Sequence, residues 1–173
     1  MLLFGVVYPL LVTVIVMFTV PGGGEGVQIK VNGKAVGFEV IGQSFVSDQY
    51  FNGRPSAVGY NAASTGGSNK GPSNPDYLNQ VDERIQDFLQ KNPDVDKSNL
   101  PVDLITASGG GLDPHISPAA AMVQIPRVAK VRGISEDVLR QLIQQNTSAP
   151  LLGIFGIPTV HVLRVNIAVD NLK

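Results

Sequence analysis

The chain is organised around the tract Gly53-Arg54-Pro55-Ser56-Ala57, which continues as Tyr60-Asn61-Ala62-Ala63-Ser64-Thr65-Gly66-Gly67-Ser68-Asn69-Lys70-Gly71-Pro72-Ser73-Asn74-Pro75. A second tract of the same kind follows downstream, Thr106-Ala107-Ser108-Gly109-Gly110-Gly111-Leu112-Asp113-Pro114-His115-Ile116-Ser117-Pro118. The 19 Gly and 12 Pro residues stay below the roughly 25 to 30% of a chain that is typical of low-complexity sequence. We therefore predict two ordered loops, and neither tract matches a catalytic signature.

Composition excludes several classes of protein. The 173 residues, 43% apolar and 16% charged, are enough for one globular domain. A net charge of −1 without any run of Lys or Arg makes nucleic acid an unsuitable partner. The absence of Cys excludes disulfides, Cys-ligated zinc and thiol catalysis, but it leaves the redox compartment open.

Residues 2–20 contain no charged side chain. A helix of that length would measure about 28 Å, close to the hydrocarbon thickness of a bilayer, and membrane helices tolerate an internal proline such as Pro9. A signal peptide is the alternative, but the chain has neither a basic start nor a small-residue cleavage site before Pro21. We predict a transmembrane anchor over 1–20, a glycine-rich hinge over 21–26 and one soluble domain over 27–173. The lack of a basic flank leaves the orientation open and leads us to expect a shortened N-terminus.

Local signals predict a mixed α/β or α+β domain on this single helix, without an internal repeat. Asn32-Gly33 is a hairpin turn signal between residues 27–31 and 35–41. Asn74-Pro75 begins a helix that should end near Asn92-Pro93. Further predicted elements are a strand over 102–106, a helix after Ser117-Pro118 that Pro126 kinks or splits, a helix capped by Ser135, and an alternating strand over 163–169.

Several residues of the two loops are of types that occur in catalytic or metal-binding sites. Ser108, Asp113 and His115 are the residue types of a hydrolase triad, but triad members normally converge from separate elements. Asp113 more simply forms a turn in which its side chain accepts from nearby backbone amides. A metal site would need further ligands beside Asp113 and His115, and the only other histidine is His161. A phosphate-binding loop is not indicated either, because Lys70 precedes Gly71 instead of following it. We expect no catalytic residue and no metal ligand; the alternative is an anchored extracytoplasmic hydrolase that uses Asp113 and His115.

Motifs along nearly the whole chain carry a more specific signal. In order, they are Val7-Tyr8-Pro9-Leu10-Leu11-Val12-Thr13, Ile41-Gly42-Gln43, Gly53-Arg54-Pro55-Ser56-Ala57, Tyr60-Asn61-Ala62, Gly66-Gly67-Ser68-Asn69 with Gly71-Pro72, Leu112-Asp113-Pro114-His115-Ile116-Ser117, Arg127-Val128-Ala129, and Val162-Leu163 with Asn166. The chain thereby resembles the KdpC family, the C subunits of the bacterial Kdp potassium-transporting P-type ATPase. It departs from the family at Lys70 and Gly110 and in lacking basic residues before the anchor.

The resemblance implies a single-pass accessory subunit of the inner (plasma) membrane, with its soluble domain on the extracytoplasmic side. Its implied partners are the KdpA pore subunit and the KdpB ATPase subunit, with KdpF as a further candidate. The subunit is expected to support assembly and to raise the ATP affinity of KdpB, so that ATP and potassium enter through the complex and no cofactor is intrinsic. Candidate residues for contacts with partners or ions lie in the two tracts: Arg54, Tyr60, Asn61, Ser68, Asn69, Asp113, His115 and Ser117.

A domain outside the membrane cannot touch ATP bound in the cytoplasm. An extracytoplasmic domain can still raise the ATP affinity of KdpB if the effect is allosteric. A typical coupling free energy of about 1–3 kcal/mol changes an affinity roughly 5- to 150-fold. Backbone carbonyls and hydroxyls of the two tracts are the oxygen ligands that potassium accepts. We therefore expect the domain to act at the outer mouth of the pore.

Overall fold

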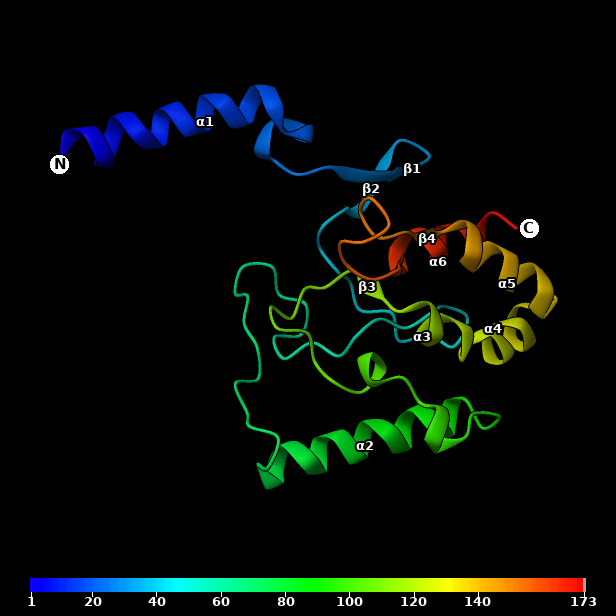
Figure 1. Ribbon diagram of the computed structural model, residues 1–173. Coiled ribbons are helices and arrows are strands. Elements are labelled where there is room, and N and C mark those ends of the chain that lie inside the picture. The colour runs from blue at the N-terminus through cyan, green and yellow to red at the C-terminus, as the bar shows by residue number, and fades with distance from the viewer. Residues whose placement is uncertain (173) are drawn as a thin grey trace. The chain divides into compact units, whose positions relative to one another are not determined.

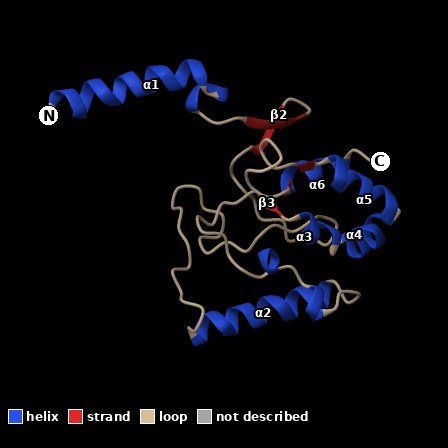
Figure 2. Cartoon of the chain, in the orientation of Figure 1, coloured by secondary structure: helices blue, strands red, loops and turns tan. Residues whose placement is uncertain are grey.

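The computed structural model describes residues 1–172 and divides the chain into two units, Met1–Ile41 and Gly42–Lys173. The elements of both units are drawn in Figure 1, and Figure 2 shows how much of the chain consists of loops between short helices and strands. Each unit has its own local structure, and the candidate site lies entirely in the second.

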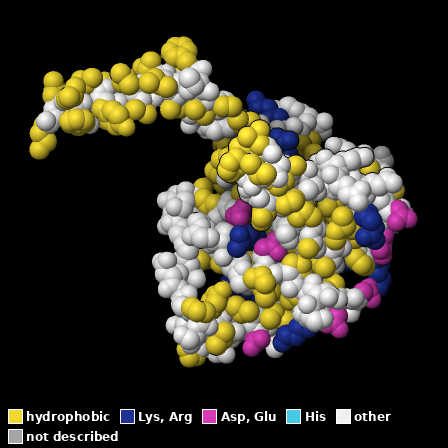
Figure 3. Space-filling model, viewed as in Figure 1, with side chains coloured by type: hydrophobic (Ala, Val, Ile, Leu, Met, Phe, Trp, Pro, Cys, Tyr) yellow, Lys and Arg dark blue, Asp and Glu magenta, His cyan; other side chains and the backbone are white. Residues whose placement is uncertain are grey.

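The first unit begins with a π-helix, η1 (Leu3–Val7), followed directly by α1 (Tyr8–Thr19). The π turn precedes Pro9, and the N–H of Tyr8 donates to the carbonyl of Leu3, five positions back. No residue of either helix is buried, and Figure 3 shows apolar side chains along this segment. Within residues 1–172 the structure contains no helix that is both long and apolar enough to cross a membrane, so the anchor predicted over 1–20 is not confirmed.

A short 3-10 turn, η2 (Pro21–Gly24), leads into the hairpin of β1 (Gln28–Val31) and β2 (Lys34–Phe38). The predicted turn is confirmed, because Asn32 and Gly33 have φ values of 51° and 78°. Both positive values belong to the turn type whose twist matches that of paired strands, and Asn and Gly adopt them at the lowest steric cost. The hairpin closes on itself, with the N–H of Glu39 donating to the carbonyl of Val27 at 2.9 Å.

In the second unit, helices and a small antiparallel sheet of order β3-β5-β4 pack around one core. The strands are β3 (His115–Ile116), β4 (Thr147–Ser148) and β5 (Thr159–His161), with His115 opposite His161 and Thr147 opposite Val160. The helices are α2 (Pro75–Lys91), α3 (Pro118–Met122), α4 (Ile125–Arg132), α5 (Glu136–Gln145) and α6 (Val162–Asp170), with 3-10 turns η3 (Lys97–Asn99) and η4 (Val102–Leu104). The mixed α/β or α+β class predicted for this domain is confirmed.

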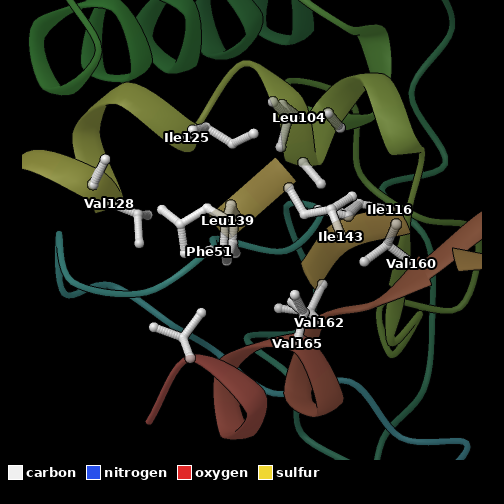
Figure 4. Close-up of a cluster of buried hydrophobic side chains, with 14 of the residues drawn as sticks. Phe51, Leu104, Ile116, Ile125, Val128, Leu139, Ile143, Val160, Val162 and Val165 are labelled. Atoms are coloured by element: carbon white, nitrogen blue, oxygen red, sulfur yellow. The ribbon is translucent and has the colours of Figure 1, made fainter. Parts of the chain in front are cut away.

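The core draws on almost every one of these elements. Phe51, Leu139, Ile143, Val160 and Val165 are fully buried, and Figure 4 shows their side chains converging with those of their neighbours. Helix α5 packs against α3, α4 and α6, and α2 contributes Phe88 to the same cluster. The core therefore holds the sheet and the helices in fixed positions behind the loops that precede β3.

Three helix starts follow the sequence prediction. The side chains of Asn74, Ser117 and Ser135 accept hydrogen bonds from backbone N–H groups at the first turns of α2, α3 and α5. These caps satisfy donors that a helix leaves without an internal partner. Pro126 lies at the start of α4, so the helix predicted after Ser117 is split into α3 and α4.

Two predicted strands are wrong. Residues 102–104 form the turn η4 and residues 105–106 continue it as a turn and a bend, because the carbonyl of Val102 accepts locally from the N–H of Ile105 and from both the N–H and the hydroxyl of Thr106. Residues 163–169 belong to helix α6, in which Val162, Val165, Asn166 and Val169 are buried. Their spacing of three and four residues fits a helix as well as the alternation fitted a strand, and the side chain of His161 caps the helix start.

Candidate functional site

The two loop tracts lie against each other, and we call residues 53–75 and 106–118 the paired loops. The N–H of Gly66 donates to the carbonyl of Gly110 at 3.1 Å, and the Ser56 hydroxyl donates to the carbonyl of Gly111 at 2.6 Å. Gly111 has a φ of +71°, and a Cβ there would lie 2.6 Å from Val58. The glycines therefore allow a backbone approach that larger residues would block.

Tyr60 forms hydrogen bonds within the first of the paired loops. Its hydroxyl donates to the carbonyl of Arg54, and its N–H donates to the hydroxyl of Ser56 at 2.9 Å. Burial raises the pKa of the Tyr60 phenol, the negative charge of Asp113 raises it further, and the positive charge of Arg54 partly opposes both. Tyr60 therefore stays a neutral hydrogen-bond donor beside a charged pair.

Arg54 and Asp113 join the two loops by an ion pair with 3.2 Å between Nη1 and Oδ2. The other carboxylate oxygen of Asp113 accepts from the N–H of His115 at 3.0 Å and lies 3.5 Å from its Nδ1. Burial opposes ionisation of Asp113, but the hydrogen bonds from His115 and the charge of Arg54 outweigh it and hold the pKa of this carboxyl below its ordinary value. The predicted turn at Asp113 is thus confirmed, with an added partner across the loops.

A groove of about 340 Å³ opens beside this pair. Its polar lining comes from Arg54, Asp103, Thr106, Asp113, His115, Ser117 and Thr159, and its apolar lining from Val102, Ile116 and Ile157. The Ser117 hydroxyl lies 3.2 Å from Asp103, and Asp103 also accepts from the N–H of Ser117 at 2.6 Å. The groove is therefore lined by one cation, two carboxylates and several hydroxyls, which come from both paired loops and from residues outside them.

Asn61, Ser68 and Asn69 lie apart from the groove, exposed on the first loop. The side chain of Asn61 accepts from the N–H of Ala63 at 3.0 Å, and Asn69 has a φ of +53°. The structure thus gathers Arg54, Asp113, His115 and Ser117 around one groove, binds the Tyr60 hydroxyl to the carbonyl of Arg54, and leaves the three remaining candidates exposed on the first loop. Whether any of the eight contacts a partner or an ion stays a prediction.

The residue types of a hydrolase triad are not assembled. Ser108 is buried, and the hydrogen bonds of the described residues include none between its hydroxyl and His115. The Asp113 carboxylate contacts Arg54 and both the backbone N–H and the ring of His115, but this pair has no hydrogen bond to Ser108 among the described residues. Over residues 1–172 no group of three or more His, Cys, Asp or Glu side chains could hold a metal ion.

A buried polar network behind the loops was missed by the sequence predictions. The guanidinium of Arg127 donates to the side chains of Asn52, Asn92 and Gln124 and to the backbone carbonyls of Asp48 and Tyr50. Asn166 in α6 exchanges two hydrogen bonds with the backbone of Phe51. These bonds fix residues 48–52 immediately before the first loop. The sequence signal that could have indicated this network is the motif Arg127-Val128-Ala129, because it places an arginine among buried helical positions.

Comparisons with known proteins agree on one family. A family model described as KdpC, "K+-transporting ATPase, c chain", matches residues 1–171. A "Potassium-transporting ATPase KdpC subunit" of Caldanaerobacter subterraneus subsp. tengcongensis is 48% identical over 168 residues, which cover 97% of this chain and 87% of the relative. Proteins with the same description from Flavobacterium psychrophilum and Flavobacterium johnsoniae are 50% and 48% identical over 171 and 173 residues, with 91% and 92% of each relative covered.

Proposed function

This chain belongs to the KdpC family of potassium-transporting ATPase subunits, and we propose that it is an accessory subunit of a high-affinity, ATP-driven potassium uptake complex. The observation that carries the proposal is the family match over residues 1–171, because it covers both units of the chain. The proposed partners are the KdpA pore subunit and the KdpB ATPase subunit, with KdpF as a further candidate. The proposed task is to support their assembly and to raise the ATP affinity of KdpB.

The division of labour follows from what the sequence lacks. The chain contains neither an Asp-Lys-Thr-Gly motif, the site of aspartyl-phosphate formation, nor a Thr-Val-Gly-Tyr-Gly filter. Hydrolysis of ATP and passage of potassium therefore fall to the partner subunits in this proposal. Deleting the gene should abolish growth at micromolar potassium, and the tagged chain should co-purify with two larger membrane proteins. Normal growth together with purification as a lone chain would refute the proposal.

We place the chain in the inner membrane through residues 1–20. In support, none of the residues in η1 and α1 is buried, and this segment carries no charge in either helix. Large apolar surfaces without a partner are expected where a protein meets a membrane or another subunit. From the family resemblance we propose in addition that the domain lies on the extracytoplasmic side.

Topology is testable with one thiol because the chain has no Cys. Ser98→Cys in the exposed turn η3 would be labelled by a membrane-impermeant maleimide in intact cells stripped of any outer barrier. Labelling without lysis is the predicted result, and it requires an allosteric effect on ATP affinity. Labelling only after lysis would place the domain in the cytoplasm and overturn this part of the proposal. The same variant in lysed cells supplies the control for reactivity.

We propose further that the paired loops act at the outer mouth of the potassium pore. The supporting features are the exposed amides of Asn61 and Asn69, the exposed backbone of Gly109 and Gly110, and the hydrogen bonds that fasten these loops together. Oxygen ligands held on a rigid backbone suit potassium, which is coordinated by carbonyls in channel filters. The loops would present such oxygens to an ion or to the rim of the pore.

The test removes the two amide oxygens. Asn69→Gly keeps a residue that accepts the positive φ, and Asn61→Ala removes the oxygen that accepts from Ala63 without adding a charge. Asn79→Ala, exposed on α2, is the matched control. The double variant should raise the potassium concentration needed for half-maximal uptake, while the control should not. Unchanged potassium affinity and unchanged assembly would remove the pore-mouth role.

A further inference from the structure

The loop between β4 and β5 carries an apolar surface that the core does not use. Its large side chains are Leu151, Leu152, Ile154, Phe155 and Ile157, and each is between 60% and 81% exposed. The loop follows β4 in Figure 1, where it is drawn in orange. No charged residue lies between Arg140 and Arg164 in the sequence, so the whole surface is free of Asp, Glu, Lys and Arg. We call residues 150–158 the apolar loop.

The backbone of the apolar loop is folded onto itself. The N–H of Leu151 donates to the carbonyl of Phe155 at 2.9 Å, and the N–H of Phe155 donates to the carbonyl of Leu151 at 3.0 Å. Gly153 and Ile154 donate to the carbonyls of Pro150 and Leu151. Backbone groups that are paired internally lose less when they leave water for an apolar surrounding. The loop is therefore suited to entering a non-polar phase as a unit.

The turn at the tip has an unusual residue for its geometry. Leu152 and Gly153 have φ values of 55° and 77°, which match the 51° and 78° of Asn32 and Gly33 in the β1–β2 turn. The first position of such turns favours Asn, Asp or Gly, since a bulky side chain is strained at positive φ. A leucine at this position does not serve the turn itself. Its side chain is 81% exposed and makes the tip apolar.

We propose that the apolar loop inserts into the lipid headgroup and acyl boundary of the membrane. Protein interfaces are enriched in Tyr, Trp, Phe, Met and Arg, and of these the apolar loop contains only Phe155. Aliphatic residues with Phe, free of any charge that would need desolvation, suit the boundary region of a bilayer. The inference rests on the proposed anchor, which brings the chain to the membrane.

Chain length keeps the domain close enough for such contact. The hairpin closes between Val27 and Glu39, so the path from Val20 to Gly42 is at most about 40 Å when fully extended. Gly42 is the first residue of the second unit and lies against the backbone of Asp113, which lines the same groove as Ile157. The base of the apolar loop and the attachment point of the domain are thus near each other within this unit.

Depth-dependent fluorescence tests the proposal on the full chain in phosphatidylcholine vesicles. An environment-sensitive fluorophore on Ile154→Cys should shift its emission to the blue and be quenched by lipids that carry a spin label near the headgroup. The same fluorophore on Ser98→Cys should stay in water. Emission of the Ile154→Cys probe typical of water would overturn the proposal. Protection that arises only after the partner subunits are added would also overturn it, in favour of a protein interface.

Two further variants separate the causes of failure. Leu152→Asn fits the turn as Asn32 does and should leave thermal unfolding unchanged or slightly improved, yet it should reduce quenching of the Ile154→Cys probe at least twofold. Undiminished quenching in this variant would contradict insertion by the tip. A probe on Val12→Cys reports on the anchor through its emission: if that emission is shifted to the blue while the Ile154→Cys probe is neither shifted nor quenched, the inference fails alone. If the Val12→Cys probe remains in water, the proposed anchor fails.

Discussion

Replacing Gly42 with alanine should loosen the contact between the start of the second unit and the second of the paired loops. A Cβ at Gly42 would lie 2.5 Å from the backbone oxygen of Asp113 and 2.9 Å from its carbonyl carbon. Ordinary carbon–oxygen contacts are about 3.3–3.6 Å, so one of the two segments must move by about 1 Å. The obstacle is backbone and cannot turn aside as a side chain would. The same movement stretches the 2.7 Å hydrogen bond from the N–H of Gly42 to the carbonyl of Leu112.

The expected loss combines both effects. Overpacking costs about 1–3 kcal/mol and a weakened hydrogen bond about 1 kcal/mol, so Gly42→Ala should lower the free energy of unfolding by about 2–4 kcal/mol. That is a large share of the roughly 5–15 kcal/mol of a typical domain. Urea unfolding of the full chain in nonionic detergent, followed by circular dichroism, measures the difference.

Gly110→Ala is the matched control because a Cβ there would meet nothing within 4 Å and its φ lies outside the left-handed region. It should leave the stability unchanged or raise it by up to about 1 kcal/mol. If Gly42→Ala unfolds within about 0.5 kcal/mol of the Gly110→Ala protein, the close approach of Gly42 to Asp113 does not determine the fold of this region, and our reasoning is refuted.

Three further perturbations test the parts that support the site. Arg127→Met leaves buried acceptors without their donor and should lower the free energy of unfolding by about 3 kcal/mol or more, measured by thermal or urea unfolding. Lys130→Met, exposed on the same helix, is the control and should lower it by less than about 0.5 kcal/mol. Equal losses in the two variants would contradict the role of the network. The pKa of Asp113 lies below its ordinary value, so the stability that its carboxylate contributes is complete above about pH 4 and is lost as the pH falls through the lower folded-state pKa. The melting temperature should therefore fall more steeply below about pH 4 in the wild type than in Asp113→Asn, and parallel curves would exclude this contribution. Ser117→Ala removes the cap of α3, which accepts at 3.0 Å, and should destabilise the chain by about 1 kcal/mol, while Ser117→Thr should retain most of the stability.

Signals that act over a few residues were readable from the sequence. Asn32-Gly33 requires positive φ at two neighbouring positions, and the caps at Asn74 and Ser135 are local hydrogen bonds. The strand predicted over 163–169 failed because its alternating residues also satisfy helical spacing, and the cap that decides between the two comes from the preceding His161. Local periodicity alone does not distinguish the two structures over so short a segment.

The arrangement of the candidate site depends on contacts that the sequence does not display. Arg54 and Asp113 are separated by 59 positions, and nothing in either tract indicates that they form an ion pair. The burial of Arg127 likewise depends on acceptors from residues 48–52 and 92, which helical spacing cannot reveal. The family resemblance named Arg54, Asp113, His115 and Ser117, which line the groove, but not Asp103, Thr106 or Thr159, and the geometry of all of them required the folded chain.

The central claim is that this subunit raises the ATP affinity of its partner. The most direct measurement is potassium-stimulated ATP hydrolysis by the purified partner subunits, with and without this chain, as a function of ATP concentration. Our account predicts that adding the chain lowers the KM for ATP about 5- to 150-fold, the range of a typical allosteric coupling. An unchanged KM, or hydrolysis by this chain in the absence of the partners, would contradict the account.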